Sequence, residues 1–98
     1  MERKKSKKQG RKFKLRLYVT GQTAHSVRAI ENIKEILSKE LKGIYELEIV
    51  DVQKNPQLAE DERIMATPTL SRVLPLPLRR IIGDLSEKDK VLLGLDLV

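Results

Sequence analysis

The segment Lys54–Leu85, with the sequence KNPQLAEDERIMATPTLSRVLPLPLRRIIGDL, places the three prolines Pro68, Pro75 and Pro77 and the arginine pair Arg79-Arg80 in apolar sequence. It opens with Asn55-Pro56, a capping residue followed by a proline at the first helical position, which favours a helix start. The later prolines are typical of a turn between two strands. We therefore expect a helix, a strand, a turn and an antiparallel strand in this order, over Pro56–Met65, Thr67–Leu74, Pro75–Pro77 and Arg79–Ile82.

Local signals conflict in this second half of the chain. Leu70, Val73 and Leu74 also have the i, i+3, i+4 spacing of a helix face, which competes with the strand prediction. A last helix is expected over Ser86–Leu97, with a capping-type arrangement at its start. It contains Gly94, which weakens a helix interior by roughly 1 kcal/mol relative to alanine. Such conflicts indicate a small energy gap between alternative structures.

The first half has clearer periodicity. Phe13–Val19 alternates apolar and polar residues, as in a strand with one buried face. Ala24–Leu41 carries one apolar helical stripe behind Thr23, a suitable N-cap, and Ile44–Val52 alternates again. A strand, an amphipathic helix and a strand make a βαβ unit with parallel strands. The whole chain is thus predicted to be α/β with the order βαβαββα, a thioredoxin-like arrangement in which Thr67-Pro68 falls where such folds place a cis-proline.

The positive charge is concentrated at the N-terminus. Residues 1–12 hold seven Lys and Arg and one Glu, so they account for the whole formal net charge of +6. A block of like charges repels itself and has few apolar groups to bury, so we expect a disordered basic tail over 1–12 and one domain over 13–98. A nucleic-acid or anionic-lipid contact through this tail is a weaker alternative, and the leading expectation includes no nucleic-acid partner.

The composition argues against catalysis. The chain has no cysteine, which excludes disulfides, thiolate nucleophiles and the redox chemistry of thioredoxins. His25 is the only histidine and is expected near a helix start on the surface, and Glu60–Glu62 would point in different directions on a helix. No phosphate-binding loop or zinc spacing is present. We therefore expect neither an enzyme nor a bound cofactor or metal.

The sequence also limits the location of the protein and its state of assembly. No apolar run approaches the roughly 20 residues that span a bilayer, and no secretory signal is visible, so we expect a cytoplasmic protein. A domain of 98 residues with few aromatic side chains has a modest aliphatic core. Burial of further surface between copies is a common source of stability in such small domains, so a dimer or tetramer is expected.

Six long spans of the sequence stand out in this order: LRLYVTG (15–21), SVRAI (26–30), KNPQLAEDERI (54–64), ATPTL (66–70), LRRIIGDLS (78–86) and KVLLGLDL (90–97). From about Phe13 to Leu97, these spans resemble the KaiB family of circadian-clock proteins. The resemblance implies two folds that share the βαβ half. One is a ground state, usually tetrameric, with its own C-terminal fold, and the other is a rarer thioredoxin-like monomer.

The resemblance also implies which residues take part in the switch and in binding. The prolines are expected to be cis in the thioredoxin-like state, and slow switching would delay complex formation. The implied fold-switch residues are Pro68, Pro75, Pro77, Gly94 and Asp96. The partner-binding candidates are cationic positions and a basic–aromatic start of the first strand, namely Arg11, Phe13, Arg28, Lys54, Arg63, Arg72 and Arg80, with Arg79 as a further candidate on the body of the domain.

The function implied by the resemblance is regulation without catalysis. The thioredoxin-like state would bind a KaiC-type ring ATPase, sequester a KaiA-type activator and compete with a sensor histidine kinase for the ring. The alternative is a KaiB-like adaptor in stress adaptation or histidine-kinase signalling, without an oscillator. Glu48 stands where the cyanobacterial pattern has a lysine, and Leu76 interrupts the usual run of three prolines. These departures favour a non-cyanobacterial member with its own KaiC-like partner.

Overall fold

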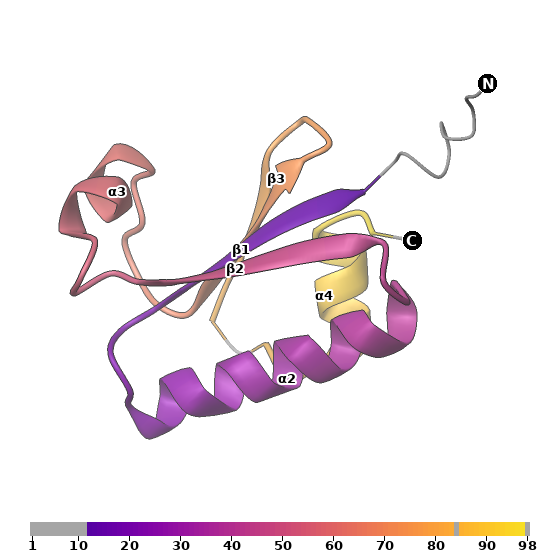
Figure 1. Ribbon diagram of the computed structural model, residues 1–98, viewed down its shortest axis with the longest axis horizontal. Coiled ribbons are helices and arrows are strands. Elements are labelled where there is room, and N and C mark those ends of the chain that lie inside the picture. The colour runs from indigo at the N-terminus through magenta and orange to yellow at the C-terminus, as the bar shows by residue number, and fades with distance from the viewer. Residues whose placement is uncertain (1–11, 84, 98) are drawn as a thin grey trace.

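The computed structural model describes residues 12–83 and 85–97, and its elements follow the predicted order βαβαββα (Figure 1). The prediction of a tail over 1–12 lies outside this range except for Lys12. Along the described chain the elements are, in order, β1 (Phe13–Val19), α2 (Ala24–Glu40), β2 (Tyr45–Asp51), α3 (Pro56–Asp61), β3 (Thr69–Leu74), β4 (Arg79–Ile82) and α4 (Lys88–Gly94).

The strands form one mixed sheet in the order β2-β1-β3-β4. β1 lies in the middle, parallel to β2 and antiparallel to β3, and β3 pairs with β4 as an antiparallel hairpin. The register places Leu17 beside Ile49 on one side and beside Leu70 on the other. The parallel βαβ unit and the hairpin are therefore both confirmed.

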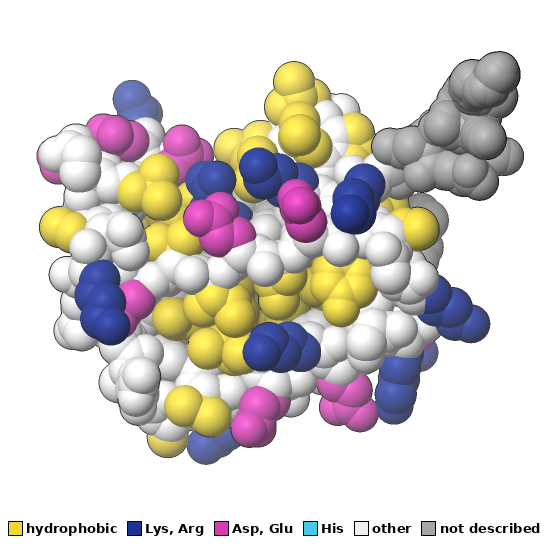
Figure 2. Space-filling view, in the orientation of Figure 1, with side chains coloured by type: hydrophobic (Ala, Val, Ile, Leu, Met, Phe, Trp, Pro, Cys, Tyr) yellow, Lys and Arg dark blue, Asp and Glu magenta, His cyan; other side chains and the backbone are white. Residues whose placement is uncertain are grey.

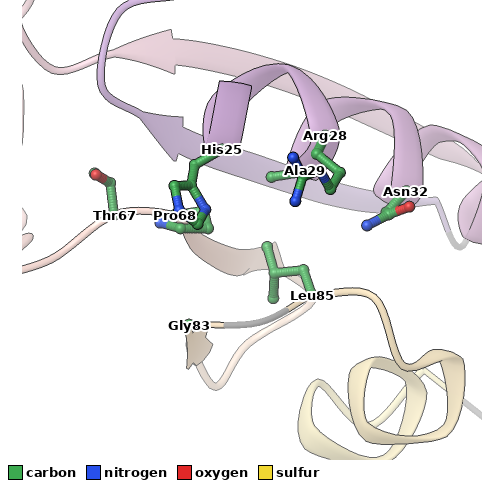
Figure 3. A pocket seen from close by; sticks show the side chains of 8 residues that line it. All are labelled: His25, Arg28, Ala29, Asn32, Thr67, Pro68, Gly83 and Leu85. Carbon is green, nitrogen blue, oxygen red and sulfur yellow. The ribbon is translucent and has the colours of Figure 1, made fainter. Parts of the chain in front are cut away.

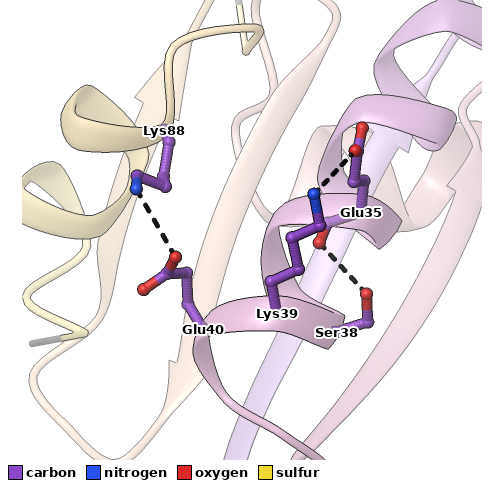
Figure 4. Close-up of polar contacts among 5 residues, drawn as sticks. All are labelled: Glu35, Ser38, Lys39, Glu40 and Lys88. Carbon is purple, nitrogen blue, oxygen red and sulfur yellow. Dashed lines mark hydrogen bonds and ion pairs between the residues drawn. The ribbon is translucent and has the colours of Figure 1, made fainter.

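The main core lies between the sheet and the two helices α2 and α4. Leu15 and Leu17 of β1, Ile33 and Leu37 of α2 and Val91 of α4 are completely buried in one cluster. Burial of each such side chain contributes about 1.5–3 kcal/mol, so this aliphatic cluster is the principal source of stability. On the surface, the Lys88 Nζ of α4 lies 3.6 Å from the Glu40 Oε2 of α2 (Figure 4), a contact of small energetic weight.

The far face of β1 is more buried than its alternating sequence suggested. Tyr18 is only 1% exposed, although it points away from the helix core. Its neighbours in register, Val50 and Thr69, are buried as well. The prediction of a single buried face was therefore wrong at this end of the strand, because both faces of the sheet are covered there.

The first helix is capped as predicted. The Thr23 hydroxyl accepts a hydrogen bond from the Ser26 N–H at 3.1 Å, which satisfies one of the free amides of the first turn. The helix ends at Glu40 with Leu41 as its C-cap, and Lys42 and Gly43 follow with φ of 44° and 90°. Gly43 provides the left-handed conformation that a glycine adopts without strain.

The later helices are shorter than predicted. α3 ends at Asp61 rather than Met65, and Arg63 takes a positive φ of 57° just beyond it. α4 begins at Lys88 behind Glu87, so the cap is not Ser86, and it ends at Gly94 rather than Leu97. Asp96 has a φ of 55°, which no continuing helix would allow, and this corrects the C-terminal boundary.

The three prolines that were singled out for the switch all follow cis peptide bonds. These are Thr67-Pro68, Leu74-Pro75 and Leu76-Pro77, as the resemblance implied for a thioredoxin-like state. The first bond is next to a polar contact, since the hydroxyls of Thr20 and Thr67 share a hydrogen bond. Among the described residues, no helix is long and apolar enough to cross a membrane.

Candidate partner-binding surface

Nothing in the described part of the chain resembles a metal centre. In residues 12–83 and 85–97, no three His, Asp or Glu side chains come close enough together to hold a metal ion. His25 is exposed and is the second residue of α2, as the sequence predicted.

A cavity of about 480 Å³ lies between the start of α2 and the loops around Pro68 and Leu85. Figure 3 shows its two walls, with the helix side chains on one side and the loop residues on the other. The lining residues are His25, Arg28, Ala29, Asn32, Thr67, Pro68, Gly83 and Leu85. One predicted partner-binding residue, Arg28, therefore lies in a cavity rather than on a flat surface.

Several other predicted cations are free to meet a partner. Lys54, Arg63 and Arg79 are exposed. No hydrogen bond or ion pair joins their side chains to another residue in the described ranges. They lie in different segments, after β2, after α3 and in β4. The exposed guanidinium groups of Arg63 and Arg79 can form bidentate contacts with carboxylates, and the Lys54 ammonium group can pair with them as a point charge, so these positions suit an acidic partner surface.

Arg72, one of the predicted partner-binding residues, is buried in this fold rather than exposed. Its side chain is 4% exposed. Nη1 donates to the Asp96 carbonyl at 3.1 Å, and Nη2 donates to the Pro77 carbonyl at 2.9 Å. The guanidinium thus joins the β3–β4 turn to the segment after α4. Alternation along β3 places Arg72 on the same face as Leu70, so the sequence did contain a signal for this burial.

Arg80 also has an internal role. Its Nη2 donates to the Glu62 carbonyl and lies 3.4 Å from the Glu62 carboxylate. The side chain is 26% exposed, so it is partly accessible while it holds the segment after α3 against β4. A partner carboxylate would have to share this guanidinium with Glu62.

The two N-terminal partner-binding candidates, Arg11 and Phe13, differ in what the structure describes of them. Arg11 lies outside the described residues. Phe13 is partly buried and packs against the main core, so only part of its ring is available to a partner. Its N–H donates to the Ile44 carbonyl at 3.0 Å, which fixes the start of β1 beside β2.

Glu48, which stands where the cyanobacterial pattern has a lysine, pairs with an arginine on the neighbouring strand. Its Oε1 accepts a hydrogen bond from the Arg16 Nε at 2.9 Å across the β1–β2 pair. Arg16 Nη1 also donates to the Tyr18 hydroxyl at 3.3 Å, and this bond, assisted by the Glu48 carboxylate, raises the pKa of Arg16 above its ordinary value. The pair was not predicted, because parallel register joins residues 32 positions apart.

Asp51 connects the end of β2 to the turn before α2. Its Oδ1 accepts hydrogen bonds from the Gly21 N–H at 3.0 Å and the Gln53 N–H at 2.9 Å. The Gly21 bond, followed by that of Gln53, lowers the pKa of Asp51, because both bonds favour the charged carboxylate. Gly21 has a φ of 60°, so glycine suits this turn.

Comparison with known proteins identifies the family. The family model described as the KaiB domain matches residues 16–97, which is most of the chain. The chain belongs to the KaiB family. The circadian clock oscillator protein KaiB of Synechococcus elongatus is 62% identical over 84 residues, covering 86% of this chain and 82% of that protein. The KaiB of Trichodesmium erythraeum is 59% identical over 86 residues, covering 88% and 83%.

Solved structures confirm the thioredoxin-like fold for this KaiB-family chain. The N-terminal domain of Synechococcus elongatus SasA superposes with a TM-score of 0.73 at 24% identity, covering 90% of this chain and 87% of that domain. Mitochondrial thioredoxin 3 of Saccharomyces cerevisiae gives a TM-score of 0.69 at 14% identity, covering 88% and 78%. At these identities the similarity is one of fold, and this chain has no cysteine for thioredoxin chemistry.

Proposed function

We propose that this chain is a non-catalytic timing regulator that binds a KaiC-type ring ATPase and modulates its phosphorylation. In the same proposal it sequesters a KaiA-type activator, competes with a sensor histidine kinase for the ring and delays binding by slow fold switching. The observation that carries the proposal is the match of residues 16–97 to the KaiB domain, with 62% identity to a circadian clock oscillator protein. The thioredoxin-like fold is the one expected of a ring-binding KaiB.

The distribution of cations supports a protein partner. Arg28, Lys54, Arg63 and Arg79 are exposed on four separate segments and form no ion pair among the described residues. The other three arginines of the described domain, Arg16, Arg72 and Arg80, already have a carbonyl or carboxylate partner within the chain. Unpaired arginine on a folded surface suits carboxylates of a partner, because such pairs gain both charge and geometry.

A different surface supports self-association. A groove of about 630 Å³ between α2 and the edge strand β2 is lined by Tyr45, Leu47 and Ile49, with polar residues along its rim. Figure 2 shows hydrophobic side chains gathered on the face between these elements. An edge strand with apolar side chains is a common pairing surface. We predict a dimer or tetramer at rest, and light scattering that finds only monomer at high micromolar concentration would contradict this.

The decisive experiment is size-exclusion chromatography with light scattering, with and without a cognate KaiC-type ring and ATP. The chain is expected to elute together with the ring. If a fold switch precedes binding, the complex should form slowly after the two proteins are mixed. A chain that never joins the ring would overturn the proposal. It would favour the adaptor role in stress adaptation or kinase signalling.

The charge pattern at β2 bears on which partners fit. Glu48 is neutralised by Arg16 at 2.9 Å, where the cyanobacterial pattern has a lysine. A partner shaped for a cation at this position would meet an internal ion pair instead. We therefore propose that the partners belong to this chain's own system, and mixing with a cyanobacterial KaiA and KaiC should give weaker complexes than mixing with the cognate proteins.

A further inference from the structure

The turn between β3 and β4 carries three exposed leucines. Leu76 is 73% exposed, and Leu74 and Leu78 are each 45% exposed. With Pro75 and Pro77 they form the sequence LPLPL (74–78), called the leucine tip below. Figure 1 shows this hairpin projecting from the body of the domain, and Figure 2 shows hydrophobic side chains at its end. A projecting apolar surface of this kind is typical of a contact with another protein or with a membrane.

The leucine tip is held in place by the buried guanidinium of Arg72. Its Nη2 donates to the Pro77 carbonyl at 2.9 Å, while its Nη1 donates to the Asp96 carbonyl at 3.1 Å. At the base of the turn, Arg72 pairs in register with Arg79 of β4. Because the turn is already tied to the body of the domain, little ordering cost remains when the leucines are covered.

The same end of the sheet carries cations. Lys14 of β1 pairs in register with Leu74, and Lys12 and Arg79 are exposed. Two carboxylates lie at this end as well, since Glu46 pairs in register with Lys14 and the Asp96 Oδ2 lies 4.0 Å from the Arg72 Nη1. Four cations therefore accompany two acids among the described residues of this end.

The start of the chain adds further positive charge beside the tip. Residues 1–11 lie outside the described ranges and hold six Lys and Arg and one Glu. They lead directly into β1, whose Lys14 is the register partner of Leu74. The most basic segment of the sequence is thus joined to the domain next to its most exposed leucine turn.

We propose that the leucine tip inserts into the interface of an anionic lipid membrane, with residues 1–11 binding the charged head groups. One short apolar element or one basic segment alone gives weak, reversible adsorption, whereas the two together give stable binding. A second copy placed tip to tip would bring the same basic segments together, and their charges would repel. Nucleic acid would satisfy the basic residues but would leave the leucines in water. Membrane binding goes beyond the function proposed above and is independent of the ring.

The test uses the full chain with vesicles of phosphatidylcholine alone or of phosphatidylcholine and phosphatidylglycerol in equal parts. The chain has no cysteine, so Leu76→Cys can carry a single environment-sensitive dye. We expect co-sedimentation with the anionic vesicles only, together with a blue shift of the dye emission. Leu93→Cys is the matched control, because Leu93 is 72% exposed but belongs to α4, and its dye should not shift.

Unlabelled variants then separate the apolar contribution from the charge. Leu76→Gln should weaken binding to anionic vesicles about tenfold, as expected for loss of a buried leucine, while Leu93→Gln should leave it nearly unchanged. The double variant Lys7→Gln/Lys8→Gln should also weaken binding by about tenfold or more, because each cation near an anionic surface contributes about fivefold. Lys34→Gln/Lys39→Gln removes the same charge from exposed positions of α2 and should have little effect.

Four results would overturn the inference. Failure to bind anionic vesicles would do so, and so would equal losses for Leu76→Gln and Leu93→Gln. A bound chain whose dye at position 76 does not shift would be held by charge alone, as it would be on nucleic acid. A blue shift that grows with protein concentration in the absence of vesicles would mean that a second copy covers the tip. No ring ATPase is present in these measurements, so each of these outcomes leaves the proposed function standing.

Discussion

Gly94 packs so closely against Ile81 that a Cβ atom added to the glycine would lie 2.7 Å from Ile81 Cδ1 and 2.9 Å from Cγ1. Real Cβ atoms do not approach carbon this closely, so the last residue of α4 meets β4 at a contact with room for hydrogen alone. From the sequence, Gly94 is a weak helix residue, so helix propensity alone would make its replacement by alanine favourable to this fold. The contact adds an opposing cost that the sequence did not show.

The first prediction compares Gly94→Ala in two backgrounds. In the parent, the gain in helix propensity of up to about 1 kcal/mol is opposed by displacement of the Ile81 side chain. In an Ile81→Ala background both close contacts are removed, so the same change should be more favourable to the fold. The free energy of unfolding from urea titrations of the four proteins measures this coupling. Equal effects of Gly94→Ala in both backgrounds would show that Ile81 moves aside at no cost.

The second prediction concerns Arg72 and the C-terminal segment. Replacement by methionine keeps much of the side-chain volume but leaves the carbonyls of Pro77 and Asp96 without their donor. A hydrogen bond to a charged donor contributes about 1.5–3 kcal/mol, so the thioredoxin-like fold should be destabilised by at least about that amount. Amide hydrogen exchange should accelerate most after residue 72. Arg79→Met, in the neighbouring strand but exposed, is the control, and equal effects of the two changes would contradict an internal role for Arg72.

The burial of Arg72 shows how far sequence reasoning reaches in this chain. The βαβ half was predicted because its apolar residues repeat with clear strand and helix periods. Alternation from Leu70 puts Arg72 on the core side, whereas Arg72 was predicted to bind a partner because it matches a cationic position of the family. The two carbonyl groups that the Arg72 side chain contacts lie 5 and 24 residues away in the sequence, so no local sequence pattern predicts these contacts.

Other differences have the same physical origin. Tyr18 was assigned to an exposed face by alternation, and it is buried because both faces of the sheet are covered there. The end of α4 was placed at Leu97, whereas the positive φ of Asp96 ends it earlier. Elements with a strong internal period were predicted well. Contacts between distant segments, including Gly94 with Ile81, were not accessible from the sequence.

The third prediction is a pH dependence of stability that comes from Asp51. The folded pKa of this carboxyl is lowered by the N–H groups of Gly21 and Gln53, so its contribution to stability is fully present above its ordinary pKa of about 4. That contribution is lost as pH falls through the lowered folded pKa, because the unfolded chain then binds the proton more readily. In thermal melts, the parent and Asp51→Asn should differ in Tm at pH 7 and converge below pH 4. A constant difference across this range would exclude the carboxylate as its source.

The fourth prediction separates two arginines that were proposed for the same surface. Arg63 is exposed and has no partner among the described residues, so Arg63→Glu should weaken ring binding roughly tenfold by facing partner carboxylates with a like charge, while folding is retained. Arg80→Glu should weaken binding and also destabilise the fold, because the new carboxylate would face Glu62, whose carbonyl and carboxylate Arg80 now contacts.

Lys39→Glu is the control, because it makes the same charge change at a position of α2 whose side chain is 70% exposed, and it should leave ring binding nearly unchanged. Affinity for the ring and the free energy of unfolding, measured for all three variants, decide the matter. If Arg63→Glu lost stability as Arg80→Glu does, or if Lys39→Glu weakened binding as strongly, the division between a free and an internally engaged arginine would be wrong.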